Sequence, residues 1–380
     1  MVKRKPVKND DITLWKPITQ DVYNEEGSLL LQKGHVLESQ RQLDIILKRG
    51  LHEMSDDISL DRAQDARVEQ LKIMSPFELI DEVYVQLSTL CSSQSTNKLN
   101  FSSRVLDLCK QLQEACQQDE DASLGAIFLS KKTEYPITHQ IHCALVCEII
   151  SKHLGRLPED RLPLLAAGLT MNIAMIELQN ILFNCKGRLN EEQRCEVRSH
   201  PQRGEARLRT YGVTDEAWLT TVLQHHELMD GKGYPQRLHG DNICQNGRLL
   251  MLADIYCAKL FPRSYRASLQ APVAAKEIYS ESRGHCFDMD LARTFIKELG
   301  IFHPGSFVRL SNGEIAVVTR RGEKIHHPIV HSVLSTGGVP YLSPKKRDCS
   351  KDEYRIINCL LPEATNVKIN RHLIWGHSLK

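Results

Sequence analysis

Histidines and one aspartate are the residues of this sequence whose types and spacing best suit chemistry. The adjacent pair His225 and His226 stands just before a loop of sequence DGKGYP (230–235). His200 precedes a proline, and Asp254 lies within the apolar segment LLMLADIYCAKL. Imidazoles are common metal ligands, and a carboxylate on an apolar helix face needs a cation as partner. The pattern predicts a metal site beside a glycine loop that can approach a ligand, although an adjacent histidine pair alone is more often surface sequence.

The composition excludes several classes of protein. Of the 380 residues, 41% are apolar and 25% are charged, which is typical of a globular chain of two or three domains and not of a disordered one. Lys plus Arg (49) nearly balances Asp plus Glu (47), so no chain-wide field favours nucleic acid or an anionic membrane. The most apolar stretch, residues 162–183, is interrupted by polar side chains and predicts a buried helix, not a membrane span.

The cysteines and the N-terminus indicate a reducing compartment. The twelve cysteines are scattered and form no CxxC pair, and no apolar segment of a signal peptide follows the basic N-terminus. We therefore expect reduced thiols and no secretion, which agrees with the bacterial cytoplasmic location that the family resemblance described below implies. Cys143 and Cys147, four residues apart, are expected to pack in a core and not to do redox chemistry.

Changes in hydrophobic period divide the chain into four parts. We expect a small β-rich N-terminal unit over residues 1–52, a linker over 53–75, an α-helical domain over 76–300 and a β-rich extension over 301–380. Ser75-Pro76 is a typical helix start, and Asn312-Gly313 predicts a hairpin turn. Further helical patterns occupy residues near 101–116, 137–154, 160–183, 190–211, 215–229, 246–260, 271–282 and 288–299.

Three motifs in the helical domain resemble the HD-GYP family, metal-dependent phosphodiesterases of bacterial cyclic di-GMP signalling built on the all-α HD fold. They are HHELMDGKGYP (225–235), GRLNEEQ (187–193) ahead of His200-Pro201, and LADIYCAKLFPRSYR (252–266). The resemblance covers roughly residues 125–300 and implies a mainly α protein with small β-rich flanks.

The sequence departs from the family pattern at its most characteristic position. The His-Asp pair that names the family falls on Met171-Asn172, the lysine that follows it falls on Met175, and an aspartate usual in the family falls on Cys257. The alignment needs no gap, because His139 lies 32 residues before Met171 and His200 lies 29 residues after it, as the family's ligand order requires.

The resemblance implies two neighbouring metal sites, of which one is expected to be lost. In the family, the first metal is held by residues matching His139, the missing pair and Asp254, and the pair's aspartate bridges to a second metal. With only His139 and Asp254 left, we expect the first site to be empty. His200, His225 and His226 match the second site, so at most one divalent metal (Fe, Mn or Zn), or none, is expected. Binding requires a distorted helix end, since neighbours on a regular helix point about 100° apart.

Cations and the glycine loop are the residues expected to bind a phosphate ligand. By resemblance the ligand-binding residues are Lys232, Gly233, Tyr234, Pro235, Arg263 and Arg266. Arg248 is a further cation expected near the pocket. The alternative for each cation is an ordinary solvated surface charge.

Two functions from different classes remain open. The first is a degenerate signalling protein with no catalytic residues, which binds cyclic di-GMP or docks signalling proteins such as diguanylate cyclases. The second is an active cyclic di-GMP phosphodiesterase with a rearranged site, in which His142 or Glu134 enters the metal shell. His142 is more simply a satisfied polar residue of its helix.

Overall fold

The structure is a computed structural model that describes residues 74–92, 100–129, 134–185, 187–261, 268–361, 367 and 369–377, together with parts of the first 53 residues. By internal contacts the chain divides into two units, Met1–Ile73 and Met74–Lys380. Most of the predicted linker, residues 54–73, lies outside the described residues. No helix in the described part of the chain is both long and apolar enough to span a bilayer.

Short antiparallel strands form the first unit. Its strands are β1 (Arg4–Pro6), β2 (Val22–Tyr23), β3 (Leu29–Leu31) and β4 (Leu51–Glu53), in the order β1-β4-β2-β3. A small core holds it together, in which Val22, Leu37 and Ile46 are buried. The predicted β-rich character is confirmed.

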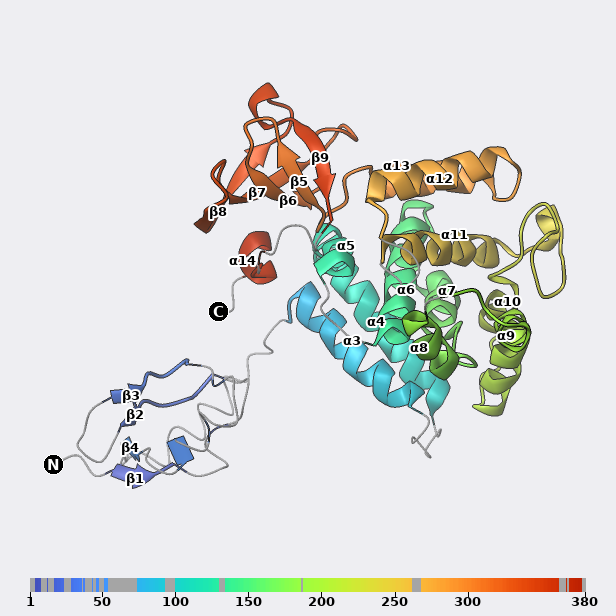
Figure 1. Cartoon of the computed structure of the whole chain (residues 1–380). Coiled ribbons are helices and arrows are strands. Elements are labelled where there is room, and N and C mark those ends of the chain that lie inside the picture. The colour runs from blue at the N-terminus through green and yellow to red at the C-terminus, as the bar shows by residue number, and fades with distance from the viewer. Residues whose placement is uncertain are drawn as a thin grey trace. The chain divides into compact units, whose positions relative to one another are not determined.

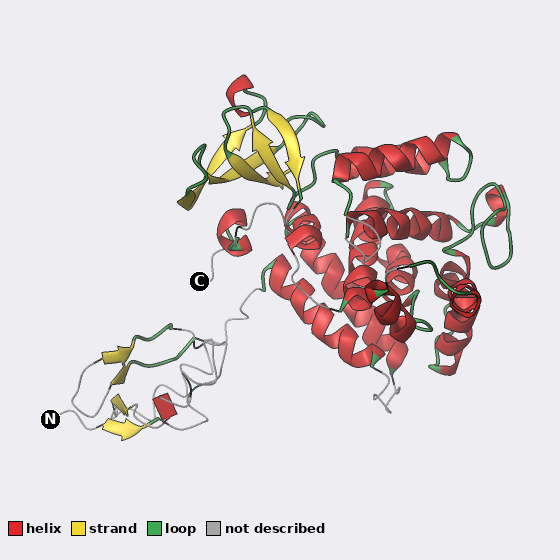
Figure 2. Ribbon diagram, viewed as in Figure 1, coloured by secondary structure: helices red, strands yellow, loops and turns green. Residues whose placement is uncertain are grey.

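The second unit is mainly helical and carries a five-stranded sheet near the C-terminus (Figures 1 and 2). Its helices are α3 (Pro76–Cys91), α4 (Phe101–Gln118), α5 (Glu120–Leu129), α6 (Tyr135–His153), α7 (Pro158–Thr170), α8 (Ile176–Asn184), α9 (Glu191–Thr210), α10 (Glu216–Gln224), α11 (Gln245–Leu260), α12 (Ala271–Arg283) and α13 (Met289–Leu299). Helix α3 begins as predicted, because the Ser75 hydroxyl accepts from the Glu78 amide and the Glu78 carboxylate accepts from the Ser75 amide. The predicted mainly α fold is confirmed.

Helix α6 is the centre of the helical domain. Every residue from Tyr135 to Ser151 is buried, and the helix packs against α3, α4, α5, α7, α8, α11 and α13 (Figure 1). A helix surrounded in this way has no solvent face, so its polar side chains must find partners inside the protein. The polar residues of α6 include His139, which is thereby held at a fixed position in the core.

The apolar segment predicted as one helix over residues 160–183 is two helices. Helix α7 ends at Thr170, residues 171–175 form turns, and α8 begins at Ile176. A local turn bond and a tertiary contact stabilise the break: the Met175 amide donates to the Asn172 carbonyl at 2.9 Å, and the Arg207 guanidinium of α9 donates to the Ile173 carbonyl at 2.8 Å. The break contains Met171 and Asn172, the two residues on which the resemblance places the family's His-Asp pair.

The C-terminal sheet is antiparallel and is followed by a short helix that packs on α3. Its strands β5 (Phe307–Leu310), β6 (Ile315–Arg320), β7 (Ile329–Leu334), β8 (Pro340–Asp348) and β9 (Ile356–Leu360) are ordered β8-β7-β6-β5-β9. Strands β5 and β6 form the hairpin predicted at Asn312-Gly313, where Gly313 has φ +89°. The chain then ends in α14 (Arg371–Trp375), whose Trp375 packs on Phe77 of α3 with ring centroids 5.5 Å apart.

Candidate metal centre

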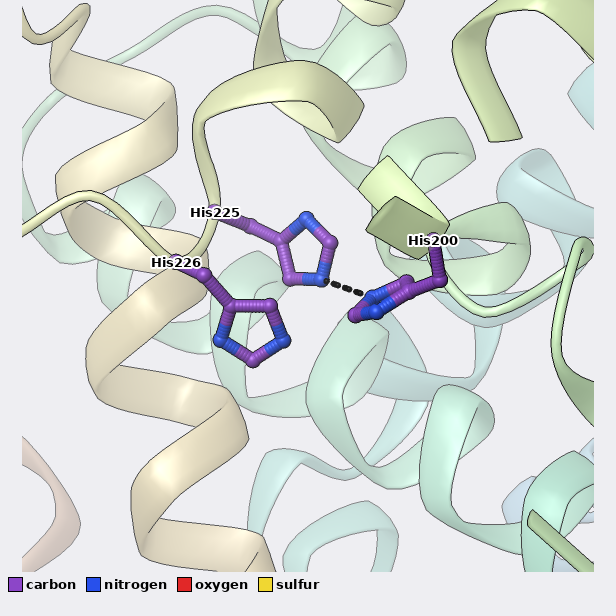
Figure 3. A group of neighbouring side chains, drawn as sticks. All are labelled: His200, His225 and His226. Atoms are coloured by element: carbon purple, nitrogen blue, oxygen red, sulfur yellow. Dashed lines mark hydrogen bonds between the residues drawn. The ribbon is translucent and has the colours of Figure 1, made fainter. Parts of the chain in front are cut away.

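Three histidines from two helices converge in the helical domain. Helix α10 ends at Gln224, so His225 and His226 lie in the turn that follows it and are freed from the 100° spacing of a helix. The ring centroids of His225 and His226 lie 4.2 Å apart, and they lie 5.1 and 5.0 Å from the ring centroid of His200 on α9 (Figure 3). One nitrogen from each ring lies within 4.8 Å of the others. The helix-end distortion that the sequence analysis required is present.

Backbone carbonyls fix the tautomers of two of these rings. The Nδ1 atoms of His200 and His225 lie 2.6 Å from the Val197 and Val222 carbonyl oxygens, which can only accept, so both Nδ1 atoms carry a proton. In the neutral rings both Nε2 atoms then present lone pairs, yet they face each other at 3.2 Å (Figure 3). That contact is favourable only with an extra proton or a cation between the rings. Metal-binding histidines are held in this way, so the donor set fits a metal ion.

Burial keeps these histidines neutral and available as ligands. Burial, reinforced by the neighbouring His225, lowers the pKa of His200 to about 3. Burial likewise lowers the pKa of His225, and it lowers that of His226 well below its usual value, with His225 adding to the effect. Neutral imidazole is the form that binds metals.

A second group joins the first through Asp254. The His139 Nε2 atom lies 2.7 Å from Asp254 Oδ1, and Asp254 Oδ2 lies 3.8 Å from the His226 Nδ1 atom. Burial alone would raise the pKa of the Asp254 carboxyl, but the bond with His139 and the neighbouring histidines hold it well below its usual range. Asp254 is therefore an anion whose two oxygens face different histidines.

A cleft of about 730 Å³ lies beside the two ligand groups. His139, His226 and Asp254 line one part of it, and aromatic rings, including Tyr135 and Tyr234, line other parts. Its cations are Arg188 and Arg194 from the segment before and within α9 and Lys259 from α11. The volume falls in the range of small-molecule sites, and the combination of rings and cations suits a ligand with bases and phosphates.

Comparisons with known proteins agree with this geometry. A family model described as an HD domain matches residues 126–291. A cyclic di-GMP phosphodiesterase of Pseudomonas aeruginosa is 26% identical over 311 residues, which are 75% of this chain and 74% of that protein. This chain belongs to the HD-GYP family. A cyclic di-GMP phosphodiesterase of Vibrio cholerae is 25% identical over 229 residues, 56% of this chain and 46% of that protein.

A solved structure shows the same fold over most of the chain. The HDG"Y"P protein of Bdellovibrio bacteriovorus superposes with a TM-score of 0.52 at 14% identity, covering 78% of this chain and 99% of that one. The HD-GYP family is related to the cyclic di-GMP phosphodiesterases, and the two ligand groups described above stand where the resemblance expected the family's metals.

Two of the positions that depart from the HD-GYP pattern, Asn172 and Met175, line the same cleft. His139 and Asp254 line it with them, and Asn172 is only 2% exposed. Met171 is fully buried in the core of the domain. The alignment expected from the sequence places the family's bridging carboxylate at Asn172, whose uncharged amide is a poor replacement.

A buried carboxylate shapes the loop that names the HD-GYP family. Glu227, which has no exposed surface, accepts hydrogen bonds from the backbone amides of Gln236 (2.6 Å), Arg237 (3.1 Å) and Leu238 (3.0 Å). The Tyr234 amide donates to the His226 carbonyl at 3.1 Å, and the Tyr234 ring stacks on the His226 ring with centroids 4.6 Å apart. The sequence analysis missed Glu227, although it follows directly after the two histidines.

The predicted ligand-binding residues divide between two grooves. Tyr234 lines the metal cleft and also a second groove of about 840 Å³, which Lys232, Gly233 and Pro235 line as well. Lys232 is highly exposed and pairs with Asp230 at 3.0 Å. Arg263 and Arg266 lie outside the described residues.

Arg248, expected as a free cation near the pocket, is a structural residue. Its guanidinium pairs with Asp241 at 2.8 Å and Asp288 at 3.2 Å and donates to the Gly240 carbonyl at 3.1 Å. Among the described residues, Arg188, Arg194 and Lys259 supply positive charge to the cleft, and the GRLNEEQ motif already contained the first of them.

The two residues suggested as substitute ligands lie elsewhere. The His142 ring stacks on Phe261 with centroids 4.8 Å apart, and within the described residues its buried Nδ1 has no hydrogen-bond partner, so the expectation of a satisfied residue was wrong. The Glu134 carboxylate accepts from the Ser88 hydroxyl at 2.9 Å in a different groove.

Proposed function

We propose that this chain is a cyclic di-GMP-binding signalling protein of the HD-GYP family that hydrolyses its ligand slowly or not at all. The observation that carries the proposal is Asn172, whose amide lines the cleft together with His139, His226 and Asp254, at the position where the resemblance places the family's bridging carboxylate. A binuclear site of that kind activates a water molecule between its two metals and neutralises the charge that develops on phosphate. With no carboxylate at position 172, both contributions are weakened.

The groups needed for binding are nevertheless present. A metal ion at His200, His225 and His226 would supply positive charge for a phosphate. Arg188, Arg194 and Lys259 add charge along the cleft. Lys259 already pairs with Glu277 at 2.6 Å and with Glu281 at 3.3 Å, while Arg188 forms no ion pair with any residue that the structure describes. Arg188 is therefore the side chain most available for a ligand phosphate.

Calorimetry with cyclic di-GMP tests this proposal. The full chain, loaded with Mn²⁺ or Zn²⁺, should bind the dinucleotide, and Arg188→Ala should weaken binding about tenfold, as expected for one charge-assisted phosphate contact. Arg203→Ala is the matched control, because Arg203 lies on α9 but lines a different groove. Absence of binding by the metal-loaded chain would refute cyclic di-GMP as the ligand. An equal loss of affinity in Arg188→Ala and Arg203→Ala would refute the cleft beside Arg188 as the binding site.

A second candidate is a working phosphodiesterase with a rearranged site. The position of Asp254 favours it, since the two carboxylate oxygens face His139 and His226, which belong to different ligand groups. A carboxylate placed in this way can take over the bridging role of the missing aspartate. Docking on a diguanylate cyclase through the GYP loop, where Lys232 is exposed, and through the β-rich flanks stays a prediction.

A further inference from the structure

A cysteine completes the ligand group from which the His-Asp pair is missing. Cys143 lies one helical turn after His139 on α6, so both side chains point to the same side of the helix. The Cys143 Sγ atom lies 3.7 Å from His139 Nε2, which itself lies 2.7 Å from Asp254 Oδ1. One ligand atom from each of these three residues lies within 4.8 Å of the other two.

We propose that His139, Cys143 and Asp254 form a thiolate-containing metal site that prefers Zn²⁺ over Mn²⁺ or Mg²⁺. The sequence analysis left His139 and Asp254 as the only ligands of the first metal site and therefore predicted that this site is empty. The Cys143 thiol supplies a third ligand. Three protein ligands with one open position are sufficient for zinc. This inference goes beyond the proposed function, because it holds whether or not a nucleotide binds or is hydrolysed.

The change of donor type should change the preferred metal. A carboxylate and an amide suit hard cations, whereas thiolate sulfur favours zinc and other thiophilic ions. As the sulfur–metal bond forms, the Cys143 thiol loses its proton to solvent, so each ion bound at this site releases one proton. Asp254 borders the cleft, from which a water molecule can reach the open position, whereas Cys143 is fully buried behind it.

A neighbouring thiol marks the limit of the site. Cys257, three residues after Asp254 on α11, is fully buried and helps to raise the pKa of the Cys143 thiol, but it does not belong to the group of mutually close ligand atoms. We therefore do not count it as a ligand of this site. For the His139 Nε2 atom to bind a metal ion, the ring proton must move to Nδ1. The Nδ1 atom is buried and has no hydrogen-bond partner within the described residues, so this move lowers the metal affinity of the site. The three-histidine group should fill first.

X-ray absorption of the zinc-loaded full chain tests the site without any substitution. With both groups filled, the zinc edge should show sulfur at about 2.3 Å, at roughly one sulfur for two zinc ions. A shell of nitrogen and oxygen alone, at full zinc occupancy, would overturn the proposal.

Cobalt spectroscopy of a variant gives the second measurement. The Co²⁺-loaded chain should show a thiolate-to-cobalt charge-transfer band in the near ultraviolet, and Cys143→Ser should lose this band and one equivalent of metal. Cys109→Ser, which changes a fully buried thiol of α4, is the matched control and should keep both. His200→Ala should keep the band and lose the other equivalent. A band that survived in Cys143→Ser would assign the sulfur to another cysteine and overturn the site.

Discussion

At the scale of single residues, the account depends on the orientation of three imidazoles. His200 and His225 each donate from Nδ1 to a backbone carbonyl, which leaves both Nε2 atoms facing a common point. His200→Ala or His225→Ala should abolish metal binding by this group, because only two protein ligands would remain. Met171→Ala should leave it unchanged, since a buried thioether is a poor ligand. Metal analysis of the dialysed variants checks this, and metal retained at full level after both histidine changes would place the ions elsewhere.

Glu227 gives a second prediction at this scale, which concerns stability. Replacement by glutamine keeps the size but removes the charge and turns an amide group toward three backbone donors. Glu227→Gln should lower the free energy of unfolding by about 2–4 kcal/mol. Urea denaturation followed by tryptophan fluorescence measures it, with the exposed Glu192→Gln as a control that should change stability by less than about 0.5 kcal/mol. A neutral Glu227→Gln would mean that the loop holds its shape without the carboxylate.

Residue types in order along the chain were enough to predict the three-histidine group, because the motif around His225 is long. They were not enough for Cys143 or Glu227. The chemical role of Cys143 depends on Asp254, which is 111 residues away in sequence and reaches it only because α6 packs on α11. Glu227 acts through backbone amides, and backbone amides leave no signature in a sequence.

At the scale of elements, the break between α7 and α8 puts Met171 and Asn172 in a turn and not in a regular helix. No glycine or proline occurs in residues 171–175, so the sequence alone predicted a continuous helix. The break is stabilised from outside, by Arg207 of α9 donating to the Ile173 carbonyl. Helix α5 was missed for a related reason, since it is short and buried on most sides and shows no amphipathic period.

Restoring the lost pair tests the role of this break. Met171→His together with Asn172→Asp returns an imidazole and a carboxylate to a turn that lines the cleft, and hydrolysis of cyclic di-GMP should rise measurably above that of the parent chain. Full activity is not expected, because Met175 and Cys257 also depart from the family and supporting contacts orient metal ligands. Without metal, the double variant should be less stable by about 2–4 kcal/mol, because a charge enters a buried segment.

The single change Met171→His is the control for this experiment, because it adds an imidazole without the carboxylate. It should show no gain in hydrolysis. If the single variant gained as much activity as the double variant, the carboxylate would not be the missing group.

At the scale of the whole molecule, an ionic cluster joins the C-terminal sheet to the helical domain. Arg320 and Arg321, where β6 ends, pair with Asp119, Glu120 and Asp121 around the start of α5. The change to a β-rich period after residue 301 was readable from the sequence, but this attachment was not, because its partners are about 200 residues apart.

This cluster predicts how stability depends on pH. Burial opposes ionisation of Glu120, but bonds from His153, Arg321 and Lys152 outweigh it and lower the pKa of the carboxyl from 4.5 to about 2. A depressed pKa in the folded state stabilises the protein above pH 4.5, and this contribution is lost as the pH falls toward 2. Allowing for screening by solvent, Glu120→Gln should therefore cost about 1–2 kcal/mol near neutral pH and less than half as much at about pH 3.

Urea denaturation across this pH range measures the difference between the two proteins. The exposed Glu323→Gln is the control and should show no such pH-dependent difference. A stability difference for Glu120→Gln that stayed constant from neutral pH down to about pH 3 would contradict the assignment, because linkage requires it to shrink as the carboxylate is protonated.

The central claim is that this HD-GYP chain binds but does not efficiently hydrolyse its ligand, because position 172 provides no bridging carboxylate. The most direct test is to incubate the purified full chain, loaded with Mn²⁺ or Fe²⁺, with cyclic di-GMP and to follow linear dinucleotide and GMP by chromatography. We predict product formation no faster than in the metal-containing buffer without protein. Robust, metal-dependent hydrolysis by the unaltered chain, abolished by His225→Ala, would contradict the account and establish the rearranged phosphodiesterase.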